Sequence, residues 1–144
     1  MNTVTVQDAN GKTTQLLSRL QKILLKSMAK MNLRNVEVDV TLVPDRVMKT
    51  LNKKYRGKNK STDVLSFSQK DMVVKGRKIL GDIIIAKETT RKQARAAGHT
   101  IRDEYAMLAI HGLLHLLDYD HEEIKDEIIM FRLQNKLLHH VQNL

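Results

Sequence analysis

Three histidines in the second half of the sequence have the residue type and spacing of metal ligands. His111 and His115 are four residues apart, and His121 follows six residues later. Residues four apart share one face of a helix, so the first two imidazoles can reach one ion. Three histidines with an open fourth position form a recurring catalytic zinc site. The spacing therefore predicts one transition-metal ion, with zinc preferred, although nickel, copper or iron also accept nitrogen ligands.

The segment around the first two histidines is strongly apolar. Residues 105–117 contain no charged side chain, which indicates a core helix. Imidazoles buried in such a helix need partners for their ring nitrogens, and a metal ion supplies one. The segment 118–120 breaks the helix and allows His121 to turn back toward the other two. The alternative is that the three histidines only form hydrogen bonds in or near the core.

The histidine spacing equals that of the metzincin proteases, H-E-x-x-H-x-x-G-x-x-H, but two positions differ. Gly112 occupies the place of the general-base glutamate, which argues against protease chemistry, although a metalloprotease remains an alternative. Asp118 occupies the place of the turn glycine. Aspartate enters the left-handed conformation at small cost, so we expect the turn to form. Asp120 either caps the last helix together with Glu123 or orients a ligand histidine.

The positive charge of the chain is concentrated before the histidines. Residues 1–102 contain 22 Lys/Arg and 8 Asp/Glu, whereas residues 103–144 contain 3 and 8. Seven basic and no acidic residues lie in segment 46–62. Clustered cations favour a polyanion, and the scarcity of aromatic residues favours phosphate contacts over base stacking. The alternative is an ordinary solvated surface.

Within this basic segment, Arg56 differs from the lysines, because a guanidinium can grip a phosphate with two parallel hydrogen bonds. We expect Arg56 to face the metal across a substrate groove and to act in catalysis. The residues expected to hold the nucleic-acid backbone are Lys53, Lys54, Lys58 and Lys60.

Length and composition indicate an ordinary globular domain. A chain of 144 residues with 42% apolar residues fits one domain over residues 1–144. The sequence has no cysteine, which excludes disulfides and thiolate ligands and fits a cytoplasmic protein. No run approaches the roughly 20 apolar residues of a membrane span, so we expect no membrane association.

The hydrophobic periodicity predicts an α+β fold with a mixed four-stranded sheet. A polar loop is expected over 55–62, and Thr100 with Asp103 resembles a capping box that starts the histidine helix. The predicted strands cover residues 3–7, 36–43, 64–67 and 79–86. The predicted helices cover residues 13–31, 44–54, 87–97, 100–117 and 122–140.

The histidine segment resembles the signature of a known family. Residues 111–121 read H-G-L-L-H-L-L-D-Y-D-H, and the pattern H-G-x-L-H-L-x-G-Y-D-H is that of the YbeY family of bacterial ribosomal-RNA maturation factors and endoribonucleases. Asp118 for glycine is the one departure. Further segments resemble the family in the same order, and they are Leu51-Asn52, Tyr55-Arg56, Ser61–Phe67 and Leu80–Ile83.

The resemblance implies a single zincin-like domain with zinc on His111, His115 and His121. It also implies action on single-stranded RNA, with Arg56 as the functional arginine. Family members mature ribosomal RNA, especially the 3′ end of the small-subunit RNA, and act in ribosome quality control, so RNA and the ribosome are the expected partners. The remaining alternative is a non-catalytic ribosome-binding factor in which the metal only braces the fold.

Overall fold

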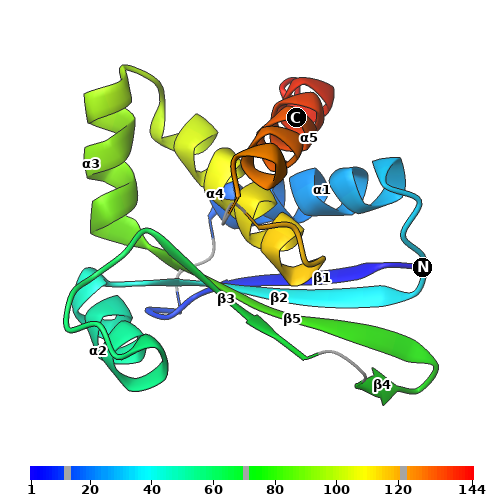
Figure 1. Ribbon diagram of the computed structural model, residues 1–144, viewed down its shortest axis with the longest axis horizontal. Helices are drawn as coiled ribbons and strands as arrows, with labels where there is room; N and C mark the ends of the chain where they lie inside the picture. The colour runs from blue at the N-terminus through cyan, green and yellow to red at the C-terminus, as the bar shows by residue number, and fades with distance from the viewer. Residues whose placement is uncertain (12–13, 70–71, 121–122) are drawn as a thin grey trace.

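The computed structural model describes residues 1–11, 14–69, 72–120 and 123–144, and Figure 1 shows their arrangement. Helices and strands interleave along the chain without strict β-α-β alternation, which fits an α+β fold. The strands are β1 (Thr3–Asp8), β2 (Val36–Val43), β3 (Val64–Ser68), β4 (Val73–Val74) and β5 (Arg77–Ala86). The helices are α1 (Gln15–Lys30), α2 (Asp45–Arg56), α3 (Lys87–Ala97), α4 (Ile101–Leu116) and α5 (Ile124–Val141).

The strands that the structure describes form one mixed sheet in the order β1-β2-β5-β3, with β4 paired to β5. The β1–β2 and β2–β5 pairs are parallel, whereas β3 and β4 run antiparallel to β5. The predicted α+β class and mixed sheet are confirmed. The sheet has five strands in the described residues and not the predicted four, because the two residues of β4 are too few to give an alternating pattern.

Helix α4 lies between the sheet and α5, and Figure 1 shows α1, α4 and α5 on the same side of the sheet. Its apolar residues enter two clusters. Leu113 and Leu116 join the cluster formed with α1 and the strands, whereas Ile110 and Leu114 join the cluster formed with α5. A helix buried nearly all round is apolar on all faces, which explains the apolar segment around the histidines.

The ends of α4 are fixed by two local motifs. At its start, the Thr100 hydroxyl accepts a hydrogen bond from the Asp103 N–H at 3.1 Å, so the predicted cap is confirmed. At its end, Asp118 has φ = +73°. The Asp118 and Tyr119 N–H groups donate to the carbonyls of His115 and Leu114, both at 3.0 Å. This pair of bonds is a Schellman motif, and the predicted left-handed aspartate turn is confirmed.

Several predicted element boundaries differ from the observed ones by one or two residues, and two of these differences lie near the candidate site. Helix α2 continues to Arg56 and ends at Gly57, which has φ = +71°, so Tyr55 and Arg56 belong to the helix and not to the loop. Helix α5 begins at Ile124, with Glu123 at the cap position and no capping bond from its side chain. The interpretation of Asp120 as the cap of α5 was therefore wrong.

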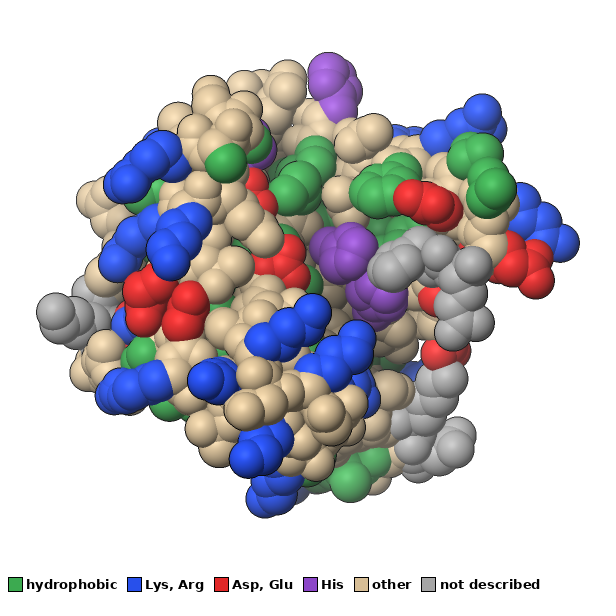
Figure 2. All heavy atoms as spheres, turned by 60° about the vertical axis from the view of Figure 1, so that its left-hand side comes forward, with side chains coloured by type: hydrophobic (Ala, Val, Ile, Leu, Met, Phe, Trp, Pro, Cys, Tyr) green, Lys and Arg blue, Asp and Glu red, His purple; other side chains and the backbone are tan. Residues whose placement is uncertain are grey.

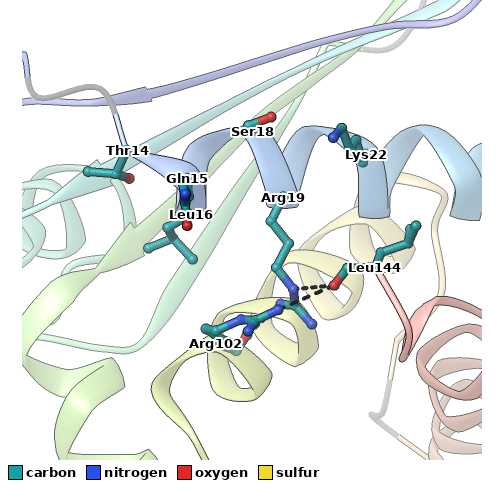
Figure 3. A pocket seen from close by; sticks show the side chains of 8 residues that line it. All are labelled: Thr14, Gln15, Leu16, Ser18, Arg19, Lys22, Arg102 and Leu144. Carbon is teal, nitrogen blue, oxygen red and sulfur yellow. Dashed lines mark hydrogen bonds between the residues drawn. The ribbon is translucent and has the colours of Figure 1, made fainter.

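An arginine on α1 ties the last part of the chain to the rest of the helical layer. The Arg19 side chain points from α1 toward Leu144 (Figure 3), and its Nε donates to the Leu144 carbonyl at 2.7 Å. Its Nη1 donates to the Arg102 carbonyl at 3.1 Å. Burial and the neighbouring Arg102 lower the pKa of Arg19 from its ordinary value. These bonds hold the end of α5 against α1 and α4.

His99 belongs to a structural pair. Its Nε2 contacts the carboxylate of Glu104, which is buried on α4. A buried carboxylate needs such a partner, so this contact gives His99 a structural role. Among the described residues, no helix is long and apolar enough to cross a membrane.

Candidate active site

Helix α4 brings the two predicted metal ligands together. The Nε2 atoms of His111 and His115 lie 3.0 Å apart, and their ring centroids are 4.6 Å apart at an angle of 72°. Both side chains are half-buried. Two imidazole nitrogens bound at about 2.0–2.1 Å to a tetrahedral zinc lie roughly 3.3 Å apart, so the pair fits one ion. The same separation also allows a hydrogen bond between the two rings in the metal-free protein.

The third predicted ligand, His121, lies outside the described residues. Within the part of the chain that the structure describes, no three histidine or carboxylate side chains are grouped so that they could hold a metal. The described portion of the candidate site is therefore the His111–His115 pair. The Schellman turn at Asp118 redirects the chain after α4, immediately before the third histidine.

A groove of about 450 Å³ runs between α4 and β3. His111 and His115 lie on one side of it, and Arg56 also lines it. The Arg56 Nη2 donates to the Ser66 carbonyl at 2.9 Å, and its guanidinium carbon lies 5.2 Å from the centre of the Phe67 ring. These contacts hold the guanidinium at the end of α2, beside the groove. The other lining residues are Thr62, Asp63, Val64, Leu65, Ser66, Ser68 and Leu116.

Next to the groove, α4 approaches the sheet closely at Gly112. The Ser66 hydroxyl donates to the Gly112 carbonyl at 3.0 Å. A Cβ added at Gly112 would lie 2.7 Å from Cγ2 of Ile83, well inside normal contact. Position 112 therefore has no room for the glutamate that a metzincin protease places there. This contact gives a packing reason for the glycine and argues against the protease alternative.

The four predicted RNA-binding lysines are all exposed and lie outside the described lining of the groove. Lys53 and Lys54 are on the last turn of α2, next to Arg56, whereas Lys58 and Lys60 are in the following loop. The Asn52 side chain donates to the Lys60 carbonyl at 2.9 Å and so fixes the course of this loop. Figure 2 shows Lys and Arg side chains gathered on the same face as two adjacent histidines. This arrangement suits a long anion that passes over the groove.

One residue of the site was missed by the sequence reasoning. The Gln134 side chain on α5 is 4% exposed, and its Oε1 lies 2.8 Å from Nδ1 of His111. The sequence feature that could have identified it is its place on the apolar side of a helix. Gln134 lies on the same buried stripe as Met130, Leu137 and Val141. Sequence alone could not assign the histidine as its partner, since the two residues are on different helices.

Comparison with known proteins places this chain in a family. The family model described as Endoribonuclease YbeY matches residues 3–142. A protein named Endoribonuclease YbeY from Persephonella marina is 37% identical over 99% of this chain and 95% of its own length. A protein of the same name from Sulfurihydrogenibium sp. is 43% identical over 82% of this chain and 78% of its own length. The chain is also similar to a solved structure, the solution structure of a Thermotoga maritima protein, with a TM-score of 0.69 and 33% identity over 96% of this chain and 88% of that one.

The fold, the histidine pair and these relatives define the class of the protein as a hydrolytic nuclease that acts on RNA. The chain belongs to the YbeY family of endoribonucleases, which are metal-dependent and act in ribosomal RNA processing. The family resemblance stated from the sequence is confirmed.

Proposed function

We propose that the protein is a zinc-dependent endoribonuclease specific for single-stranded RNA, which matures the 3′ end of small-subunit ribosomal RNA and acts in ribosome quality control. The observation that carries this proposal is the pair of Nε2 atoms 3.0 Å apart in a groove that is also lined by an arginine. We further propose that it works in the cytoplasm, with the ribosome as its partner.

In this proposal, zinc is held by His111, His115 and His121. All three are neutral nitrogen donors, and two of them already have a separation that fits a tetrahedral ion. When bound, zinc polarises a phosphoryl oxygen and lowers the pKa of a coordinated water. The half-buried position of the pair leaves one side open to the groove, where a phosphodiester can approach.

Arg56 is the proposed catalytic residue on the protein side of the reaction. One Nη atom is occupied by the Ser66 carbonyl, which leaves N–H groups of the same guanidinium for a non-bridging phosphate oxygen. Because the Ser66 carbonyl and the Phe67 ring hold the guanidinium, little conformational entropy is lost when it binds the phosphate. Arg56 then offsets negative charge that grows on the phosphate during attack.

The four lysines have a separate proposed role outside the groove. Lys53, Lys54, Lys58 and Lys60 contact the RNA backbone and contribute affinity without sequence preference. Each lysine that contacts a phosphate adds about 0.7 to the slope of log binding constant against log salt for a single strand. Replacing Lys58 and Lys60 together with alanine should therefore reduce this slope by about 1.4 while the maximal cleavage rate changes little.

The direct test of the proposed activity compares cleavage of a labelled single-stranded RNA by zinc-loaded wild type, His115→Ala and Arg56→Ala, all purified identically. We expect loss of activity in His115→Ala and a fall of about 10²–10³-fold in turnover for Arg56→Ala, the magnitude for a lost charge-stabilising donor. Lys49→Ala is the matched control, because Lys49 is an exposed cation on the same helix and outside the groove lining. Equal cleavage by wild type and His115→Ala would refute the metal-dependent reaction, and full activity of Arg56→Ala would refute the catalytic role of the arginine.

A further inference from the structure

Gln134 is a buried amide in an otherwise apolar contact between two helices. Helix α5 packs on α4 through Met130, Leu137 and Val141, and Gln134 lies on the same stripe at 4% exposure. Burying an amide without a partner costs about 1–3 kcal/mol, so its partner determines what the residue does. That partner is the imidazole of His111, 23 residues earlier in the sequence.

The geometry of this contact determines which nitrogen of His111 carries the proton. The amide Oε1 is an acceptor only, and it lies 2.8 Å from Nδ1, so Nδ1–H donates to it. A neutral imidazole with its proton on Nδ1 has the lone pair on Nε2. That Nε2 is the atom that lies 3.0 Å from Nε2 of His115. Gln134 therefore aims a lone pair of His111 at the position shared by the two rings.

We propose that Gln134 is a positioning residue that fixes the tautomer and the ring orientation of His111 for metal binding. The inference rests on the proposed function, since the metal is the group that uses the lone pair. Partners of this kind on the second ring nitrogen of a metal-bound histidine contribute about 10–100-fold in metal affinity. Gln134 does not touch the substrate, so its effect on catalysis passes through His111.

The helix that carries Gln134 is held on both sides of the amide, which gives the acceptor a fixed place. On one side Met130 packs in the cluster with Ile110 of α4, and on the other Leu137 and Val141 pack in the same cluster. Beyond the helix, the Leu144 carbonyl accepts from Arg19 at 2.7 Å (Figure 3). An acceptor on a rigid, packed helix holds an imidazole more accurately than one on a loop.

The test uses two substitutions at position 134 and a control on the neighbouring surface. Gln134→Leu keeps an apolar side chain of similar size but removes the acceptor, whereas Gln134→Glu keeps an acceptor at the same place. Asn135→Leu is the matched control, because Asn135 is an exposed residue of the same helix. Zinc affinity is measured by competition with a chelator, and the His111 tautomer is measured by ¹⁵N-resolved NMR of the metal-free proteins.

We expect Gln134→Leu to bind zinc about 10–100-fold more weakly than wild type, and Gln134→Glu and Asn135→Leu to retain wild-type affinity. We also expect the Nδ1–H tautomer of His111 in wild type and its loss in Gln134→Leu. Equal zinc affinity of wild type and Gln134→Leu, or an Nε2–H tautomer of His111 in wild type, would overturn the proposed role of Gln134. Neither outcome would affect the proposed function of the protein. A wild type that binds no zinc would instead overturn the proposed function, and with it any role of Gln134 toward the metal.

Discussion

The substitution Gly112→Ala tests the close contact between α4 and the sheet. Two opposing effects, a steric clash and a gain in helix propensity, determine whether it lowers or raises the free energy of unfolding. The added Cβ would lie 2.7 Å from Cγ2 and 3.2 Å from Cγ1 of Ile83, and 3.2 Å from the Ser66 hydroxyl. Carbon atoms in contact prefer about 3.5–4.0 Å, so helix and strand must move apart. Overpacking of this kind costs about 1–3 kcal/mol, whereas replacing glycine by alanine in a helix gains about 1 kcal/mol. We expect a net loss of about 1 kcal/mol in the free energy of unfolding.

The assay is urea unfolding followed by far-ultraviolet circular dichroism, since the chain has no tryptophan for fluorescence. A Gly112→Ala variant more stable than wild type would refute the reasoning, because the helix propensity would then act without a clash. The background Ile83→Ala is the control. It removes both Ile83 carbons near the added Cβ, so in this background Gly112→Ala should become neutral or stabilising.

Three further substitutions test other parts of the fold. Gly81→Ala should cost about 3 kcal/mol or more in unfolding free energy, because φ is +143° and a Cβ would lie 2.0 Å from the Phe67 carbonyl oxygen; a soluble variant with unchanged thermal unfolding would contradict this. Asp118→Val should lower the free energy of unfolding in urea by about 1–2 kcal/mol, because a β-branched residue is strained at φ = +73°. Asp118→Asn should lower it less, and equal losses in the two variants would argue against backbone strain. Asp39→Asn should raise the free energy of unfolding by about 0.2–1 kcal/mol at pH 7, because Asp39 faces the like charge of Asp82 across β2 and β5. Burial, and then the charge of Asp82, raise the pKa of Asp39. Because its pKa is raised, the Asp39 carboxyl binds a proton more tightly in the folded protein than in the unfolded chain. The destabilisation by ionised Asp39 in the wild type therefore disappears as the pH falls through the raised pKa toward 3.8. Over that pH range, the difference in urea midpoint between the variant and the wild type should narrow.

Elements governed by local signals could be predicted from the sequence. The bounds of β2 and α3 match the predicted ranges, since a β-branched alternating run and a glycine stop are each contained in a few residues. The cap at Thr100 and the turn at Asp118 are local in the same sense. The end of α2 was placed two residues early although Gly57, a suitable stop residue, was present, because the charged segment before it looked like a loop.

Features that depend on distant residues could not be predicted in the same way. The pairing of β5 with both β2 and β3 brings Arg56 and Ser66 close to α4, and no local pattern specifies this order. The contact between Gln134 and His111 depends on how α5 packs across α4. The spacing of His111 and His115 predicted that they share a face, whereas the groove beside them follows from the tertiary packing.

The position of Gln134 late in the chain has a consequence for the order in which the site is completed during synthesis. The ribosome adds about 5–20 residues per second from the N-terminus, so the residues that line the groove are all made before α5. A nascent chain therefore acquires Arg56, His111 and His115 first, and the acceptor that orients His111 only afterwards. In the proposed site, the newly made chain therefore has the acceptor that orients His111 for a metal only once its last helix has folded.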